Sequence, residues 1–129
     1  VANKGKRMEP HLVKRVTTAD FSEISKVNPK EITQAVSPEQ ADTITQLMYG
    51  SERHTTGYNG NSYASKTGTA ENGGPNPHVW YVAFDPAKDV AVAVMVKDGG
   101  GQGSTATGGK VSAPIGRAIL DAAPKGGAS

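Results

Sequence analysis

The sequence has no cysteine and few aromatic residues. Among its 129 residues, Phe, Trp and Tyr together make up 5%. The lack of cysteine excludes disulfides, zinc–cysteine sites and thiol catalysis, but it does not identify a compartment. Hydrophobic residues account for 36% of the chain, which is thin for a self-sufficient core. One small domain, or part of a larger one, is therefore expected.

Strong net charge and long apolar runs are also missing. The net charge is +2, and the cationic residues are scattered, so no nucleic-acid or membrane-surface footprint is predicted. No run approaches the roughly 18 apolar residues of a membrane span, and no signal peptide begins at Val1. The opening residues read as the end of a helix with Gly5 as its left-handed cap. This pattern predicts a fragment of a longer chain.

The first half of the chain predicts one short strand and one helix. The strand is expected over residues 11–16, followed by an exposed polar excursion over 17–30. Ser37, Pro38 and Gln40 then form a good helix start, because Ser37 can cap, Pro38 suits the first turn and Gln40 completes a capping box. Apolar residues at helical spacing extend this helix over residues 38–53.

The second half predicts three strands and a terminal helix. The strands are expected over residues 62–71, 78–84 and 90–96. Both faces of the second are apolar and should be covered, and the unbroken apolar third is typical of a central strand buried on both sides. The buried face of the helix is expected to carry Val111, Ile115, Ala118, Ile119 and Ala122. The predicted fold class is α/β of the α+β type, an antiparallel sheet flanked by helices.

The tetrapeptide Lys66, Thr67, Gly68 and Thr69 is the strongest candidate site. Strand alternation places Lys66 and Gly68 on one face and the two threonines on the other. A glycine in an edge strand lets a ligand's backbone lie alongside, and a lysine with two hydroxyls suits a carboxylate. The competing interpretation is an exposed polar edge strand in which the lysine blocks aggregation.

A glycine-rich loop over residues 98–109 resembles a phosphate cradle only superficially. The nucleotide-binding pattern needs a glycine where Ser104 stands, and a hydroxyl residue where Val111 follows Lys110. A simple strand-to-helix connection is expected instead.

The remaining polar and aromatic candidates have plain interpretations. His11, His54 and His78 lack metal-ligand spacing and are expected at the surface or the core edge, so no metal or cofactor is predicted. Glu52 and Glu71 could act as acid or base, but nothing in the sequence pairs either with a partner. Trp80 and Tyr81 are expected in the core.

With its neighbours, the Lys66–Thr69 motif resembles a known family. The segments "SKTGTAE", "PHVWYVAFDP", "VAVAVMV" and "STATGGKVSAPIGRAIL" resemble the C-terminal part of a class B penicillin-binding protein, most of all the actinobacterial penicillin-binding protein A type. The opening "VANKGKRMEPHLVKRV" is similar to the segment after a core helix of that transpeptidase domain. The resemblance covers almost the whole chain and is vaguest over 17–30. It implies that residues 1–123 are part of such a domain. Pro124, Lys125, Gly126 and Gly127 are expected to end the last helix, so residues 124–129 are predicted to be a flexible tail.

The resemblance implies a peptidoglycan D,D-transpeptidase that works through a serine acyl-enzyme and is acylated by penicillin. Lys66 would supply charge for the substrate or β-lactam carboxylate and assist proton transfer, and the Thr67 and Thr69 hydroxyls would hydrogen-bond that carboxylate. The Thr69 backbone N–H would be one of two oxyanion donors. Gly68 would keep the strand open for the substrate backbone.

The chain departs from the family in lacking two of its motifs. It contains neither the Ser-x-x-Lys nucleophile motif nor a Ser-x-Asn motif; Glu23, for example, stands three residues before Lys26. The chain is therefore expected to be inactive alone and to work only against the upstream part of the same protein. The family also implies an extracytoplasmic location with a membrane anchor outside this chain.

Two alternatives stay open from the sequence. A serine β-lactamase or penicillin-sensing domain shares the Lys-Thr-Gly strand. A non-catalytic module that binds D-Ala-D-Ala peptides along this edge would also fit the motif.

Overall fold

The computed structural model describes residues 1–124, which form two compact units. One unit comprises Val1 and residues 3–42, and the other comprises Ala2 and the chain from Thr43 onward. Apart from Pro124, the tail expected over 124–129 lies outside the described residues.

The first unit holds two small antiparallel strand pairs. Strand β1 (Lys6–Met8) pairs with β4 (Glu31–Gln34), and β2 (Arg15–Thr17) pairs with β3 (Glu23–Lys26). The strand expected over 11–16 is wrong in extent, because only its last two residues belong to β2. The excursion over 17–30 is exposed as predicted, but it contains β3.

Gly5 adopts the predicted left-handed conformation but does not end a helix. Its φ is +81°, and the residues before it form a turn that leads directly into β1. A Cβ on Gly5 would lie 2.0 Å from the Val36 carbonyl oxygen, so contact with the end of the β4 segment requires a glycine here. The predicted left-handed conformation of Gly5 is confirmed, but the predicted helix before it is wrong.

The first helix, α1 (Pro38–Arg53), has the predicted bounds and the predicted capping box. The Ser37 backbone N–H donates to Gln40 Oε1 at 2.9 Å, and the Gln40 N–H donates to Ser37 Oγ at 3.2 Å. These bonds satisfy two groups that every helix start leaves free.

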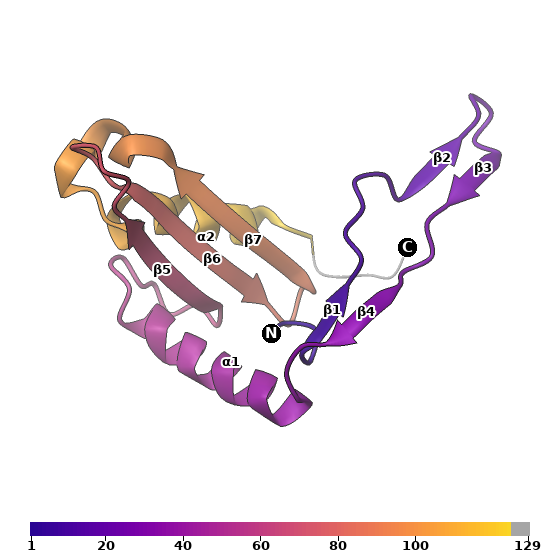
Figure 1. Cartoon of the computed structure of the whole chain (residues 1–129), viewed down its shortest axis with the longest axis horizontal. Helices are drawn as coiled ribbons and strands as arrows, with labels where there is room; N and C mark the ends of the chain where they lie inside the picture. The colour runs from indigo at the N-terminus through magenta and orange to yellow at the C-terminus, as the bar shows by residue number, and fades with distance from the viewer. Residues whose placement is uncertain (125–129) are drawn as a thin grey trace. The chain divides into compact units, whose positions relative to one another are not determined.

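The second unit is built on a three-stranded antiparallel sheet (Figure 1). Its strands are β5 (Ala64–Ala70), β6 (His78–Asp85) and β7 (Val90–Val96), in that spatial order. A 3₁₀ segment η1 (Lys97–Thr105) and a π turn η2 (Gly108–Ser112) lead to the helix α2 (Ala113–Ala122), which packs on β6 and β7. The antiparallel sheet with helices confirms the predicted fold class.

Within the described residues β7 pairs with β6 alone and lies at the edge of the sheet, so its prediction as the central strand is wrong for the sheet that this chain forms. The central strand is β6, and only one of its faces is covered within the described residues. On the other face Trp80 and Val82 are each 40% exposed, and Met95 of β7 is 47% exposed. An apolar run reports which side chains avoid water, but it carries no information on strand order.

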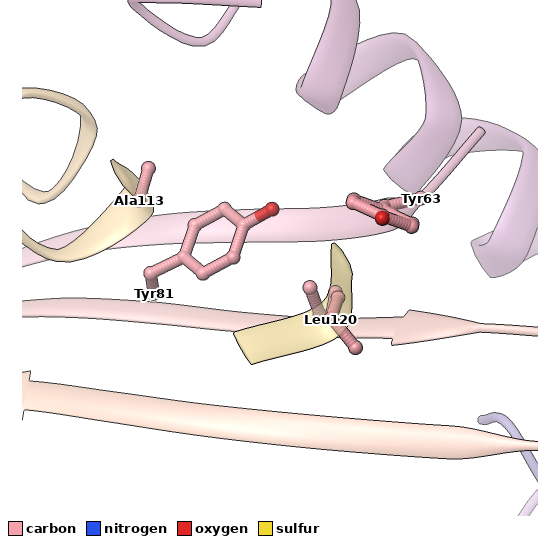
Figure 2. Packing of buried hydrophobic residues seen from close by; sticks show 5 residues of the cluster. Tyr63, Tyr81, Ala113 and Leu120 are labelled. Carbon is pink, nitrogen blue, oxygen red and sulfur yellow. The ribbon is translucent and has the colours of Figure 1, made fainter. Parts of the chain in front are cut away.

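The core lies between the covered face of the sheet and α2. It consists of Tyr63, Tyr81, Ala83, Ala113 and Leu120. Figure 2 shows the Tyr81 ring beside Ala113 and Leu120, which both come from α2. The tyrosine predicted in the core is therefore fully buried, whereas its neighbour Trp80 is not.

The face of α2 that packs on the sheet differs from the predicted one. Ile115 and Ile119 are 45% and 47% exposed, while Gly116 and Leu120 are buried. A Cβ on Gly116 would lie 2.3 Å from Tyr81 Cδ1, so the helix approaches the sheet through its small residue. A pattern of large apolar residues cannot reveal such an approach.

Candidate functional site

Strand β5 carries the Lys66–Thr69 motif along a free edge of the sheet. Within the described residues its one strand neighbour is β6, where Thr67 is paired with Tyr81 and Thr69 with Val79. Lys66 is paired with Val82, whose side chain lies on the open face. The register confirms that the two threonines share one face and that Lys66 lies on the other.

The two threonines line a pocket of about 330 Å³ beside β5. A pocket of this size is at the lower end of the range that holds small ligands. Its lining is polar and comes from the end of α1 and the loop after it, from β5 and from the segment before α2: Ser51, His54, Thr55, Thr56, Thr67, Thr69, Thr107, Gly108 and Gly109.

Four hydroxyls on this pocket are available to a ligand. In the part of the chain that the structure describes, the side chains of Ser51, Thr56, Thr67 and Thr69 make no hydrogen bond. Thr55 Oγ1, in contrast, donates to the Ser51 carbonyl at 2.9 Å. The lining contains no carboxylate. Hydroxyl donors without a competing negative charge favour an anionic or strongly accepting ligand.

Lys66 is exposed and lies outside the pocket lining. Its Nζ donates to the Thr67 carbonyl oxygen at 2.6 Å. An ammonium group has three donors, so at least one remains for a ligand. The Lys66 ammonium group therefore lies beside the edge of β5. Its side chain leaves the strand on the face opposite the Thr67 and Thr69 hydroxyls.

The glycine-rich loop forms a wall of the site, so its interpretation as a simple connection was incomplete. A Cβ on Gly108 would lie 2.3 Å from the Trp80 carbonyl oxygen and 2.8 Å from that of Gly68. The loop thus packs directly on the backbone of the Lys66–Thr69 motif. Only glycine permits this contact, because the obstructing atoms are backbone and cannot turn aside.

Replacing Gly108 with alanine is expected to displace the loop or β5. We expect the free energy of unfolding to fall by about 1–3 kcal/mol, because an added methyl group would force backbone atoms apart. Chemical denaturation measures the loss. The matched control is Gly101→Ala, where a Cβ meets nothing within 4 Å. Equal stabilities for the two variants would contradict the assigned contact.

A buried ion pair holds the two sides of the pocket together. Arg117 Nε of α2 donates to Glu52 Oε1 of α1 at 2.7 Å, and the two side chains are 6% and 1% exposed. Glu52 also accepts hydrogen bonds from the Ser65 hydroxyl, from Tyr81 at 3.0 Å and from Asn61 at 2.9 Å. The sequence offered no partner for Glu52, and the structure supplies four within the residues that it describes.

These contacts set the protonation of the buried groups. Burial acts to raise the Glu52 pKa, but the hydrogen bonds from Arg117, Ser65, Asn61 and Tyr81 outweigh it and hold the pKa below the ordinary value. Burial and the neighbouring Glu52 charge raise the pKa of Tyr81 to about 12. Glu52 is therefore a carboxylate, and Tyr81 is a neutral hydroxyl donor.

Arg117 extends this network to the pocket lining. Its Nη1 donates to the Thr56 carbonyl at 2.8 Å, and its Nη2 to that of Thr55 at 3.5 Å. On the other side, the Ser65 hydroxyl that donates to Glu52 belongs to the residue before Lys66. The pair thus fixes the loop after α1 and the start of the motif strand in one arrangement.

His54 belongs to the pocket, although the sequence indicated an ordinary surface or core-edge histidine. Its Nδ1 lies 2.8 Å from the Gly50 carbonyl oxygen, one helical turn back. His78 instead accepts a hydrogen bond at Nδ1 from the Asp98 N–H at 3.1 Å, away from this pocket. Sequence spacing could not show which of the two histidines lies at the pocket. The path of the chain after α1 places His54 there.

The structure places a free strand edge, a lysine beside it and unpaired hydroxyls together around the Lys66–Thr69 motif. A Lys-Thr-Gly motif is one of the signatures of penicillin-binding proteins and class A β-lactamases. The chain belongs to the penicillin-binding protein transpeptidase domain family, which matches residues 1–121.

The chain is similar to named and solved members of this family. It is 47% identical to the peptidoglycan D,D-transpeptidase PbpA of Mycolicibacterium smegmatis, over 98% of the chain and 28% of that protein. The M. tuberculosis penicillin-binding protein A, solved as a ceftriaxone acyl-enzyme complex, superimposes with a TM-score of 0.85 at 44% identity, over 95% of the chain and 29% of that protein. A D,D-transpeptidase domain from Eggerthella lenta gives a TM-score of 0.68 at 29% identity, over 94% of the chain and 30% of that structure.

The chain spans less than a third of the length of these relatives. Among the described residues, no helix is both long and apolar enough to cross a membrane.

Proposed function

We propose that residues 1–123 form the C-terminal part of the transpeptidase domain of a peptidoglycan D,D-transpeptidase. The single observation that carries this proposal is the Lys66–Thr69 motif on a free sheet edge beside a pocket of unpaired hydroxyls. The similarity to proteins named peptidoglycan D,D-transpeptidase supports it. In the reaction, a serine hydroxyl of the whole protein would attack the penultimate D-alanine carbonyl of a stem peptide. The peptide bond to the terminal D-alanine breaks, and this residue leaves as free D-alanine with the proton of the serine. An amine of a neighbouring stem then attacks the ester, forms the new peptide bond and returns a proton to the serine oxygen.

The free edge of β5 is suited to the proposed roles of the motif. The stem peptide would extend the sheet alongside Gly68, where no side chain obstructs it. The unpaired Thr67 and Thr69 hydroxyls would bind the terminal carboxylate, with Lys66 supplying charge and assisting proton transfer. In an antiparallel pair, alternate residues direct their N–H groups away from the partner strand. The Thr69 N–H on this edge would be one oxyanion donor.

The partner proposed for this chain is the upstream part of the same protein. That part would carry the Ser-x-x-Lys and Ser-x-Asn motifs, which this chain lacks. The open sheet face with Trp80, Val82 and Met95 supports the proposal, because large apolar side chains on one face normally pack against another element. An extracytoplasmic location, with a membrane anchor outside this chain, would follow from the function.

β-Lactams are the inhibitors proposed for the site. M. tuberculosis penicillin-binding protein A was solved as acyl-enzyme complexes with ceftriaxone, imipenem and penicillin G. The same drugs are expected to acylate the serine of the whole protein and to place their carboxylate against Thr67 and Thr69.

Denaturing intact-mass spectra, recorded with and without penicillin G, test this function. The whole protein is expected to gain the mass of the drug, and this chain alone is expected to gain none. An adduct on the isolated chain would contradict the assignment of the nucleophile to the upstream part. If the whole protein gained no mass but still bound D-Ala-D-Ala peptides, a non-catalytic peptide-binding module would replace the transpeptidase. Rapid release of the acyl group would indicate a β-lactamase.

A further inference from the structure

We propose that His54 is a specificity-determining residue of this site, which selects ligands that carry a carboxylate. The proposal rests on the proposed function. It starts from the lining of the pocket, where His54 faces the same space as Thr67 and Thr69 although it lies outside the motif. It is the one titratable side chain among the lining residues.

The hydrogen bond to Gly50 determines which ring nitrogen serves the pocket. A carbonyl oxygen only accepts, so the contact of 2.8 Å requires the proton on Nδ1. Nε2 makes no hydrogen bond within the described residues and is the nitrogen available to a ligand. When the ring is neutral, Nε2 accepts; when it is protonated, Nε2–H donates and the ring carries positive charge.

Hydrogen bonds fix both the His54 ring and the backbone that follows it. The ring is tied to the last turn of α1 through Gly50. The two residues that follow are anchored by Arg117, which donates to the carbonyls of Thr55 and Thr56. A side chain on an anchored backbone can discriminate between ligands, because little ordering free energy is lost when it binds.

Most of the charged residues adjacent in sequence to the pocket lining are cationic, which favours an anion in the pocket. On α1 its neighbours are Arg53 and the carboxylate of Glu52, which is bonded to Arg117 of α2. Strand β5 contributes Lys66 on its opposite face, and the loop before α2 contributes Lys110 next to the lining residue Gly109. Glu52 is the single acidic group of this set, and it is already paired. A carboxylate and an imidazolium would stabilise each other here.

Two substrates and two variants of the whole protein test this selection. The rate constant of acylation is measured with penicillin G and with its methyl ester, at about pH 5.5 and about pH 8, the range over which histidine side chains change charge in proteins. The variants are His54→Gln, which stays neutral, and His54→Arg, which stays charged. His11→Gln is the matched control, since His11 does not line the pocket.

The wild-type protein is expected to react with penicillin G faster at the lower pH than His54→Gln by about fivefold, the scale of one partly solvated ion pair. His54→Arg should keep the faster rate at both pH values. With the ester, which lacks the carboxylate, the three proteins should follow the same pH profile, and His11→Gln should match the wild type throughout.

Identical pH profiles for the wild type and His54→Gln with penicillin G would overturn the role of His54 while leaving the transpeptidase assignment intact. So would a difference that persists with the ester, since it would arise from structure rather than from charge recognition. Failure of the wild type to be acylated by either compound would instead overturn the proposed function.

Discussion

Replacing Arg117 with leucine is expected to lower the free energy of unfolding of the whole protein by about 3–5 kcal/mol. The variant leaves the Glu52 carboxylate buried without its cation, and an unpaired buried charge strongly destabilises the folded state. It also removes the donors to the Thr55 and Thr56 carbonyls. Chemical denaturation at neutral pH measures the loss.

The matched control is Arg53→Leu, which removes the same charge from an exposed position on α1. It is expected to change stability by less than about 0.5 kcal/mol. A double variant, Glu52→Met with Arg117→Leu, should recover part of the loss, because an apolar pair leaves no buried charge. Equal losses in Arg117→Leu and Arg53→Leu would contradict the role of the ion pair.

The effect of Arg117→Leu should depend on pH in a defined direction. In the wild type, the Glu52 pKa is held below the ordinary value of 4.5, so its stabilisation is present above that pH and is lost as pH falls through the folded-state pKa. In the variant, burial without the cation raises the Glu52 pKa, so the destabilisation is largest at neutral pH and is relieved as the carboxylate takes up a proton. The difference between the two proteins should therefore shrink below about pH 5.

Replacing Lys66 with alanine is expected to slow penicillin acylation of the whole protein by about 100-fold or more, the scale of a lost proton-transfer or charge-stabilising group. Lys66 is exposed at the edge of β5, and its Nζ reaches the Thr67 carbonyl at that edge. The fold should not suffer, because the Lys66 side chain is exposed. Stopped-flow acylation and thermal unfolding, measured on the same sample, separate the two effects.

Lys97→Ala is the matched control for this variant. Lys97 is also an exposed lysine beside the sheet, its Nζ lies 3.9 Å from Asp98 Oδ2, and it does not line the pocket. Its acylation rate is expected to match the wild type. If the two lysine variants reacted equally fast, the charge of the Lys66–Thr69 motif would have no part in the reaction.

Several parts of the fold follow from residues that are neighbours in the sequence. The capping box of Ser37 and Gln40 starts α1 where it was predicted, and the apolar run Val90–Val96 forms β7 with the predicted bounds. Alternation along β5 correctly separates Lys66 from Thr67 and Thr69. These features depend on local backbone preferences and on the period of two in a strand, so a short stretch contains all the information they need.

Contacts between distant segments decided the rest. The pairing of Glu52 with Arg117 joins residues 65 positions apart, and the approach of Gly108 to Gly68 depends on how the loop before α2 folds back. The order of the strands likewise placed β7 at an edge, although its composition is that of a central strand. The sequence by itself determined the motif strand and the face of each of its side chains. The tertiary structure alone decided that His54, Thr56 and Thr107 share a pocket with it, because packing brings together side chains that no spacing rule connects.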